Sequence, residues 1–227
     1  MAATCTILDL GLKPYAEVLQ LQETLFQKNI LAKEQSKPTE NTLLLCEHYP
    51  VYTLGKSGKR ENILVSDEEL NAEYYHVSRG GDVTFHGPGQ LVVYPIFDID
   101  TLDIGLAQFI FKLEEAVIET LRHYELKGER IENAAGIWLR KPDGADEKIC
   151  AIGVRASRHV TMHGLAININ TDLSYFNKIV PCGLQGKGVT SLSKELNREE
   201  SIEHFKSVFI EKVTDVFDFT HTHSTVK

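Results

Sequence analysis

The sequence predicts an α+β fold in which helices pack on a mixed, mostly antiparallel β-sheet. Short apolar segments with period-two alternation recur along the chain, and three longer segments carry apolar residues at helical spacing. The 227 residues are 42% hydrophobic, enough to bury one core, and no internal repeat or low-complexity linker divides them. We therefore expect one domain over residues 1–219, followed by a frayed tail at 220–227.

The N-terminal part predicts a strand at residues 4–10 and a helix at residues 14–33. Four apolar residues give that helix an apolar face at helical spacing: Val18, Leu21, Leu25 and Phe26. A second apolar strand follows at residues 42–47. We expect the next stretch, which contains Pro50, to be an edge strand, because proline cannot donate a ladder hydrogen bond.

A short helix is predicted after Ser66, which has the position of an N-cap. Glu69, three residues later, completes a capping box. The longest helical pattern covers residues 106–124, and the last predicted helix covers residues 199–217. Both carry apolar stripes that we expect to pack on the sheet, through Phe109, Leu113, Val117 and Leu121 in the first and Ile202, Phe205, Phe209 and Val213 in the second.

Three strands are predicted between these two helices. Residues 136–140 and 148–155 are joined by K-P-D-G-A-D-E, a turn-rich segment that is typical of a hairpin. Residues 161–170 would pair next, with alternate residues on opposite faces. The apolar row is Leu165, Ile167 and Ile169, and the opposite row, near the pocket predicted below, is Ala166, Asn168 and Asn170. Asn168 is either a pocket residue or a structural amide.

The segment from Arg79 to Pro95, R-G-G-D-V-T-F-H-G-P-G-Q-L-V-V-Y-P, has the composition of a substrate-binding loop that enters a strand. Four glycines within eleven residues permit positive φ and let a ligand lie against the main chain, while Pro88 restricts one turn. Residues 90–96 then look extended. The alternative, an ordinary tight hairpin, does not account for four polar side chains within twelve residues: Arg79, Thr84, His86 and Gln90.

Cys182 is the candidate nucleophile, because it lies between Pro181 and Gly183. A rigid and a permissive neighbour suit the presentation of a thiol at a loop apex, whereas most free cysteines are small buried hydrophobes. A thiol attacks as the thiolate, so a nucleophilic cysteine needs a cation or a base beside it. Lys148, which begins an apolar strand, is our candidate for lowering the thiol pKa and for acting as general acid and base.

Four segments, matching in order and spacing over nearly the whole chain, resemble the lipoyl(octanoyl) transferase family, which has the biotin and lipoate protein ligase fold. They are R-G-G-D-V-T-F-H-G-P-G-Q from Arg79, K-I-C-A-I-G-V-R from Lys148, H-G-L-A-I-N from His163, and P-C-G around Cys182. The resemblance implies that Cys182 holds the acyl group as a thioester and that Lys148 lowers the pKa of the thiol.

The resemblance also implies which residues bind the acyl substrate. They come from three backbone segments: Arg79, Gly80, Gly81, Asp82, Val83, Thr84, Phe85 and His86; Ala151, Ile152 and Gly153; and Gly164, Leu165 and Ala166. One departure from the family pattern is Cys150, where we expect a small residue without a thiol. Two residues from Lys148 on a strand, it should point to the same face. It is thus a rival nucleophile, which we discount on the resemblance alone.

The implied reaction moves octanoyl from acyl carrier protein to Cys182 and then to a specific lysine of a lipoyl domain, the first step of endogenous protein lipoylation. The acceptors would be E2 subunits of 2-oxoacid dehydrogenases and the glycine cleavage H protein. Thioester exchange is nearly balanced and amide formation is downhill, so we expect no ATP, other cofactor or metal. An ATP-dependent lipoate or biotin protein ligase, in which Cys182 has no role, is one alternative. A non-catalytic lipoyl-domain binding module is another.

The charge distribution bears on the partners. A net charge of −8 and the lack of a nucleic-acid module argue against nucleic acid. Residues 148–194, however, contain six Lys and Arg against the single acid Asp172, and a second basic cluster contains Lys56, Lys59 and Arg60. Such local charge suits an acidic partner. The alternative is a solvated face without a partner.

The remaining features predict a cytoplasmic protein without membrane contact. The chain does not begin with a basic region followed by an apolar stretch, and no run approaches the roughly 18 apolar residues of a membrane span. Four cysteines without a C-x-x-C pair indicate reduced thiols. The nine histidines show no metal-binding spacing, and His221 and His223 fall in the predicted tail.

Overall fold

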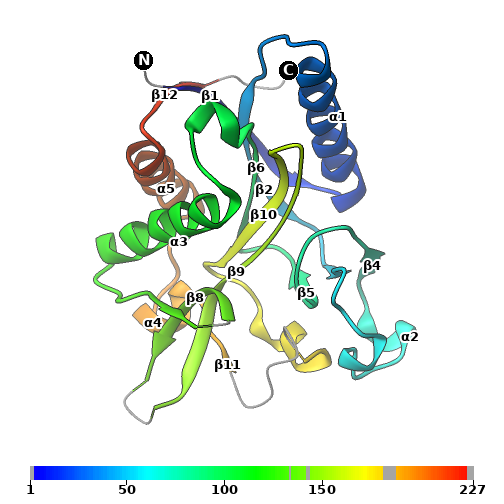
Figure 1. The fold of residues 1–227 in the computed structure, drawn as a ribbon. Helices are drawn as coiled ribbons and strands as arrows, with labels where there is room; N and C mark the ends of the chain where they lie inside the picture. The colour runs from blue at the N-terminus through cyan, green and yellow to red at the C-terminus, as the bar shows by residue number, and fades with distance from the viewer. Residues whose placement is uncertain (1–2, 133, 142–143, 181–187, 224–227) are drawn as a thin grey trace.

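A mixed nine-stranded sheet runs through the centre of the part of the chain that the computed structural model describes, residues 3–132, 134–141, 144–180 and 188–223 (Figure 1). In order across the sheet, its strands are β12 (Phe219–His223), β1 (Ala3–Lys13), β2 (Asn41–His48), β6 (Gln90–Ile96), β10 (Val160–Asn168), β9 (Asp146–Ser157), β8 (Ala134–Arg140) and β7 (Glu129–Ile131), with β11 (Gly188–Val189) beside β9. The pairs β12–β1, β1–β2 and β11–β9 are parallel, and the other pairs are antiparallel. The predicted α+β class and mostly antiparallel sheet are confirmed.

Helices cover both faces of this sheet. One face carries α3 (Leu106–His123) and α5 (Ile202–Phe217), which lie on the same side in Figure 1. Their predicted apolar stripes are buried against strand residues such as Leu165 and Ile167, in the largest apolar cluster of the described chain. The other face carries α1 (Tyr15–Glu34), whose Val18 and Phe26 pack on Leu44, Val92 and Ala166. Each such buried side chain stabilises the fold by about 1.5–3 kcal/mol relative to exposure.

A smaller three-stranded sheet, in the order β4 (Glu73–His76), β3 (Val51–Leu54) and β5 (Val83–His86), lies beside the large one. Short helices pack on it through Ile63, Leu70 and Phe176: η1 (Arg60–Asn62), α2 (Asp67–Leu70) and η3 (Leu173–Lys178). The predicted edge strand after Pro50 is wrong, because β3 is the central strand of this sheet. Pro50 precedes the strand and contributes only its carbonyl, which accepts from Glu73 N at 3.1 Å.

The helix cap predicted at Ser66 is present in the structure. Ser66 Oγ accepts from Glu69 N at 3.3 Å, and a Glu69 carboxylate oxygen accepts from Ser66 N at 3.0 Å, so the capping box is confirmed. The two remaining short helices begin with similar contacts: η2 (Ile99–Leu102) at Asp98 and α4 (Leu192–Leu196) at Ser191. No helix in the described ranges is both long and apolar enough to cross a membrane.

The C-terminal segment corrects a second expectation. Residues 220–223, predicted to be frayed, continue β12 in register with β1, from Ala3 opposite Phe219 to Ile7 opposite His223. Backbone hydrogen bonds with β1 order this short polar segment, and its side-chain pattern does not predict that pairing. Residues 224–227 of the predicted tail lie outside the described part of the chain.

Candidate active site

The loop from Arg79 to Asp82 lies directly on the backbone of β9. Gly80 N donates to Val154 O at 2.9 Å. A Cβ at Gly153 would lie 2.8 Å from Gly80 O, and one at Gly55 would lie 2.4 Å from Gly81 O. Such close approach of three backbone segments is possible only without side chains between them. The glycines therefore shape the loop, as the sequence predicts.

Arg79 ties this loop to the small sheet. Its guanidinium donates to Thr53 O at 2.6 Å, to Thr53 Oγ1 at 3.0 Å and to Gly80 O at 2.9 Å. The side chain is only 9% exposed. Several hydrogen bonds from one planar group hold the loop more firmly than a single contact would, so Arg79 orients the loop as well as facing the cleft.

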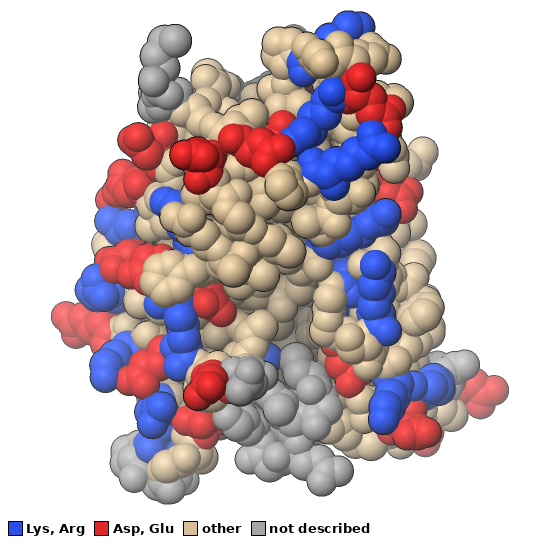
Figure 2. Space-filling view, in the orientation of Figure 1, with Lys and Arg blue, Asp and Glu red and all other residues tan. Residues whose placement is uncertain are grey.

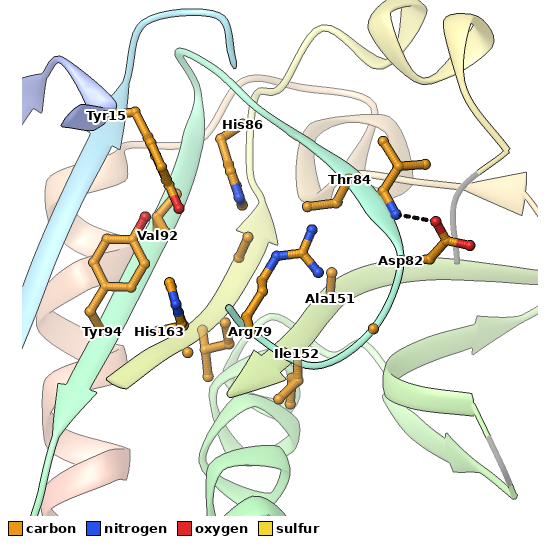
Figure 3. Close-up of a pocket in the computed structure, with 16 residues that line it drawn as sticks. Tyr15, Arg79, Asp82, Thr84, His86, Val92, Tyr94, Ala151, Ile152 and His163 are labelled. Carbon is orange, nitrogen blue, oxygen red and sulfur yellow. Dashed lines mark hydrogen bonds between the residues drawn. The ribbon is translucent and has the colours of Figure 1, made fainter. Parts of the chain in front are cut away.

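A cleft of about 490 Å³, its mouth included, opens between this loop and strands β6, β9 and β10. Figure 3 shows Arg79 near its middle, with Thr84, Asp82 and Ala151 toward one end and Tyr15, Tyr94 and His163 toward the other. Twelve predicted substrate-binding residues line it: Arg79, Gly81, Asp82, Val83, Thr84, His86, Ala151, Ile152, Gly153, Gly164, Leu165 and Ala166.

Two predicted pocket residues do not line this cleft. Gly80 is hydrogen-bonded to the backbone of β9. Phe85 points into the core of the small sheet, where it stacks on Tyr175 with ring centroids 4.3 Å apart. Strand alternation explains Phe85, because its neighbours Thr84 and His86 share the cleft face. The prediction missed four lining residues, Tyr15, Val92, Tyr94 and His163. Val92, Tyr94 and His163 lie inside segments quoted above, whereas Tyr15 does not.

One end of the cleft is polar, and its histidines are neutral. Burial lowers the pKa of His86 and of His163 to about 3, and that of nearby His48 to about 4. His86 Nδ1 contacts Gln90 Oε1 at 2.8 Å, and His48 Nε2 contacts the Tyr94 hydroxyl at 2.8 Å. Neutral imidazoles beside buried Arg79 avoid the cost of several like charges in one enclosed region.

Lys148 lies in a second, smaller cavity that adjoins the cleft. The two share Thr84, Ala151 and Ala166 as lining residues, and the smaller one adds Lys148, Gln90, Asn168, Phe176 and Val189. Asn168 accepts from Gln90 Nε2 at 2.9 Å and donates to Thr190 O at 3.0 Å, so it is both a lining residue and a satisfied amide. Asn170, predicted near the pocket, instead bonds the backbone of Glu200.

A β-bulge aims Lys148 at this cavity and turns Cys150 away from it. Lys148 pairs with Trp138 and Cys150 with Ile137, so Ile149 is the extra residue of β9. The predicted common face for Lys148 and Cys150 is therefore wrong, because a bulge breaks the alternation and redirects side chains. Cys150 is fully buried in the α3/α5 core, where burial raises the pKa of its thiol. In this environment the Cys150 thiol stays protonated near neutral pH.

Lys148 itself is 6% exposed, with Nζ 4.6 Å from the centroid of the Trp138 ring and 3.1 Å from Ala135 O, to which it donates. Cys182 lies outside the described residues. On one side of residues 181–187, Val180 N donates to Asn62 O at 2.7 Å. On the other side, Gly188 and Val189 pair with Glu147 and Lys148. The chain thus re-enters the described structure directly beside Lys148.

Comparison with known sequences finds close relatives. Residues 14–214 match the model of the lipoyl protein ligase A/B catalytic domain. The chain is 50% identical over 211 residues to an octanoyltransferase of Parabacteroides distasonis, which covers 89% of this chain and 96% of the relative. It is 48% identical over 203 residues to an octanoyltransferase of Bacteroides thetaiotaomicron, covering 88% and 89%.

Solved structures share the fold at low identity. A bi-partite lipoate protein ligase of Thermoplasma acidophilum, studied with its E2 lipoyl domain, has a TM-score of 0.72 at 15% identity, covering 100% of this chain and 88% of that one. A lipoate-protein ligase A bound with ATP has a TM-score of 0.72 at 16% identity, covering 100% and 90%. A biotin protein ligase of Aquifex aeolicus reaches 0.51 at 12% identity, covering 96% and 70%. The predicted ligase-like fold is confirmed.

Proposed function

The chain belongs to the lipoyl protein ligase A/B catalytic domain family and is an octanoyltransferase, and we propose that it works through a thioester on Cys182. The octanoyl group would come from acyl carrier protein and pass to a lysine of a lipoyl domain. The observation that carries this proposal is the position of Lys148, in a small cavity adjoining the cleft and beside the point where the chain returns from Cys182.

Lys148 takes up one proton and gives it away again in each half of the proposed reaction, so that the protons balance. First, the Lys148 amine takes the Cys182 thiol proton, and the thiolate attacks the octanoyl carbonyl. The carrier leaves as a thiolate and receives this proton from Lys148. Next, the acceptor amine attacks the new thioester while Lys148 removes its proton. Cys182 leaves as thiolate and recovers that proton, which regenerates the enzyme.

The cleft accounts for an acyl substrate of limited length. Its lining combines apolar Val83, Val92, Ile152 and Leu165 with the polar end described above. Burial of a methylene contributes about 0.8 kcal/mol, so each carbon that fits the cleft raises affinity by roughly fourfold. We propose that the octanoyl chain extends from the Lys148 cavity past Thr84 and Ala166 into this cleft.

The proposed acceptor of the octanoyl group is a lipoyl domain. The archaeal ligase that shares this fold was studied with its E2 lipoyl domain, which supports a lipoyl domain as acceptor here. E2 subunits of 2-oxoacid dehydrogenases and the glycine cleavage H protein are the acceptors we propose to test. ATP-dependent ligation remains the competing activity, because a ligase bound with ATP has the same fold.

Intact mass spectrometry after incubation with an octanoyl thioester, without nucleotide, tests the acyl-enzyme. We expect one octanoyl group per chain in the parent and in Cys150→Ala, and none in Cys182→Ala. Transfer to a lipoyl domain should follow the same pattern, because Cys150 is buried with a raised thiol pKa.

Three results would argue against the proposal. Octanoyl mapped to Cys150 by digestion would reassign the nucleophile. Modification of the lipoyl domain only with free octanoate and ATP would show a ligase. Binding of a lipoyl domain without any transfer would leave a non-catalytic module.

A further inference from the structure

The peptide group between Ala135 and Gly136 in β8 is hydrogen-bonded at both ends by ionisable side chains. Its carbonyl oxygen accepts from Lys148 Nζ at 3.1 Å, and its N–H donates to Glu114 Oε1 at 3.3 Å. Lys148 belongs to β9 and Glu114 to α3, on the far face of the sheet from the cleft. One peptide plane thus joins an amine and a carboxyl group from two separate elements.

Glu114 is held in place by an arginine. It is 9% exposed, and its other oxygen accepts from Arg130 Nε at 2.9 Å. Arg130 also donates to Glu115 Oε2 at 2.8 Å and to Phe111 O at 2.9 Å. A carboxylate in so enclosed a position is costly unless its oxygens are bonded. Here one oxygen is committed to Arg130 and the other to the backbone of β8.

The backbone that Glu114 contacts has a conformation only glycine adopts at low cost. Gly136 has φ of +109°, and a Cβ there would lie 2.3 Å from Cys150 O. This residue lies beside the bulge that directs Lys148 to its cavity. An unusual backbone conformation persists where surrounding contacts hold it, and the Glu114 hydrogen bond is one such contact.

We propose that Glu114 is a positioning residue for Lys148, acting through the Ala135–Gly136 peptide. A carboxylate at the N–H end and an amine at the C=O end both align with the peptide dipole, so the two hydrogen bonds strengthen each other. The carboxylate fixes the carbonyl direction, and the carbonyl fixes Nζ within the small cavity. Glu114 touches no substrate.

The proposal rests on the proposed role of Lys148 and predicts a selective defect. A mobile Lys148 is seldom within hydrogen-bond reach of the Cys182 thiol, so proton transfer slows. The cleft that holds the acyl chain lies on the other face of the sheet and keeps its shape. The loss should therefore appear in kcat, with the KM for a small octanoyl thioester little changed.

Glu114→Met and Glu114→Gln form the central comparison, because both keep the side-chain length and only glutamine keeps an oxygen that can accept from Gly136 N. We expect Glu114→Met to lose about 10-fold or more in kcat and Glu114→Gln to keep most of the parent activity. The pH profile of Cys182 alkylation should shift to higher pH in Glu114→Met alone. Glu115→Met is the matched control, because Glu115 also binds Arg130, whereas Gly136 N donates to Glu114; it should behave like the parent.

Labelling of Lys148 with acetic anhydride, measured by peptide mass spectrometry, separates this proposal from the proposed function. We expect several-fold faster labelling of Lys148 in Glu114→Met than in Glu114→Gln or Glu115→Met, whatever the role of Lys148 in transfer. Equal labelling in all three, with thermal unfolding confirming that each is folded, would overturn the positioning role. Normal transfer by Lys148→Ala would instead refute the catalytic role of Lys148 and leave the labelling result standing.

Discussion

Lys148 reaches its cavity from a strand on which Cys150, two residues along, faces the opposite core. Both side chains are nearly or fully buried, but their partners differ: Lys148 has a carbonyl and an indole ring, whereas Cys150 is packed among apolar residues. Burial penalises a charged group unless hydrogen bonds compensate for it. Cys150 is therefore a core residue, whereas Lys148 has polar partners that suit the role in proton transfer proposed above.

Lys148→Arg separates charge from proton transfer. Arginine keeps the positive charge that is proposed to act on the Cys182 thiol but, with a pKa above 12, it does not exchange a proton near neutral pH. We expect the variant to fold and to bind an octanoyl ligand, with transfer reduced by about 100-fold or more. Steady-state transfer assays check this result, together with the pH dependence of Cys182 alkylation.

The alkylation data distinguish the two roles. In Lys148→Arg, alkylation should still proceed at low pH, whereas in Lys148→Ala it should require higher pH. Near-normal transfer by Lys148→Arg would restrict Lys148 to an electrostatic role. Identical alkylation profiles in the parent and Lys148→Ala would remove Lys148 from the mechanism.

At the scale of the elements, glycines let backbones meet without side chains between them. The 79–82 loop reaches β9 through Gly80 and Gly153, and β10 lies close to its antiparallel neighbour β6 at Gly164. In all three places the contact atom is a main-chain oxygen, which cannot move aside as a flexible side chain can. Loop and strands therefore keep the cleft walls in one arrangement.

Gly164→Ala tests this packing. A Cβ at this position would lie 2.1 Å from Val93 O and 2.7 Å from Pro95 Cδ, so β10 and β6 must separate. We expect a loss of about 1–3 kcal/mol in the free energy of unfolding, measured by urea denaturation, and a lower affinity for octanoyl ligands. Gly105→Ala, where no atom lies within 4 Å of the added Cβ, is the control and should cost less than about 1 kcal/mol. Equal stability of the two variants would contradict the model of the cleft wall.

Most elements were predictable because their signals are local. Apolar spacing located α1, α3 and α5, and the Ser66 capping box was correct to the residue. The errors arose where pairing with a distant segment determines the position of a strand. β3 is central because β4 and β5 flank it, and β12 forms because it pairs with the edge of β1. The bulge in β9 likewise depends on β8 and not on its own residues.

For the whole molecule, three neutral histidines near the cleft couple stability to pH. The pKa values of His48, His86 and His163 are lowered by burial to about 4, 3 and 3. Their unfolded value is about 6.5, so below that pH the unfolded chain binds protons that the folded chain does not. The contribution of these three histidines to the free energy of unfolding is therefore complete above about pH 6.5, and it is lost as the pH falls toward 4.

We expect the free energy of unfolding to fall between pH 7 and pH 5 by about 1–2 kcal/mol per histidine. Urea denaturation at a series of pH values measures it. His48→Gln should show a shallower decline than the parent, because one of the three groups is gone. Carboxylates with lowered pKa lose their contribution at lower pH, so this window isolates the histidines. A flat profile between pH 7 and 5 would show that these imidazoles accept protons in the folded state.

The basic segment at residues 148–194 is less available to a partner than its charge count indicates. Arg158 pairs with Glu34, Lys194 pairs with Glu147, and Lys178 donates to the carbonyls that end α2. Arg155 contacts Ser78 and lies over the Phe26 ring. In Figure 2, Lys and Arg side chains gather along the side formed by α1 and the small sheet, beside a central hollow. Lys56 and Lys59 on the small-sheet side are exposed.

Lys56→Glu with Lys59→Glu tests carrier docking on this surface. We expect acylation by a carrier-protein thioester to slow by about 10-fold at low salt and acylation by a small neutral thioester to change little, because steering acts on a charged macromolecule. The difference should shrink as ionic strength rises. The control, Lys127→Glu with Lys212→Glu, makes the same charge change at two lysines outside the small-sheet cluster. Equal slowing of both donors at every salt concentration would show that Lys56 and Lys59 shape the site and do not steer the carrier.

The sequence by itself determined the fold class, the helices and the glycine-rich loop, because apolar periodicity, caps and glycine conformations act over a few residues. It also brought Arg79, Thr84 and His86 to one site, since they stand together in the chain. Only the tertiary structure decided that Tyr15, Tyr94 and His163 line the cleft. It also decided that a bulge directs Lys148 to its cavity, and that Lys148 and Glu114 bind the same peptide group of β8. Those contacts join residues of separate elements, and the direction of each side chain there depends on strand pairings and packing that no local pattern encodes.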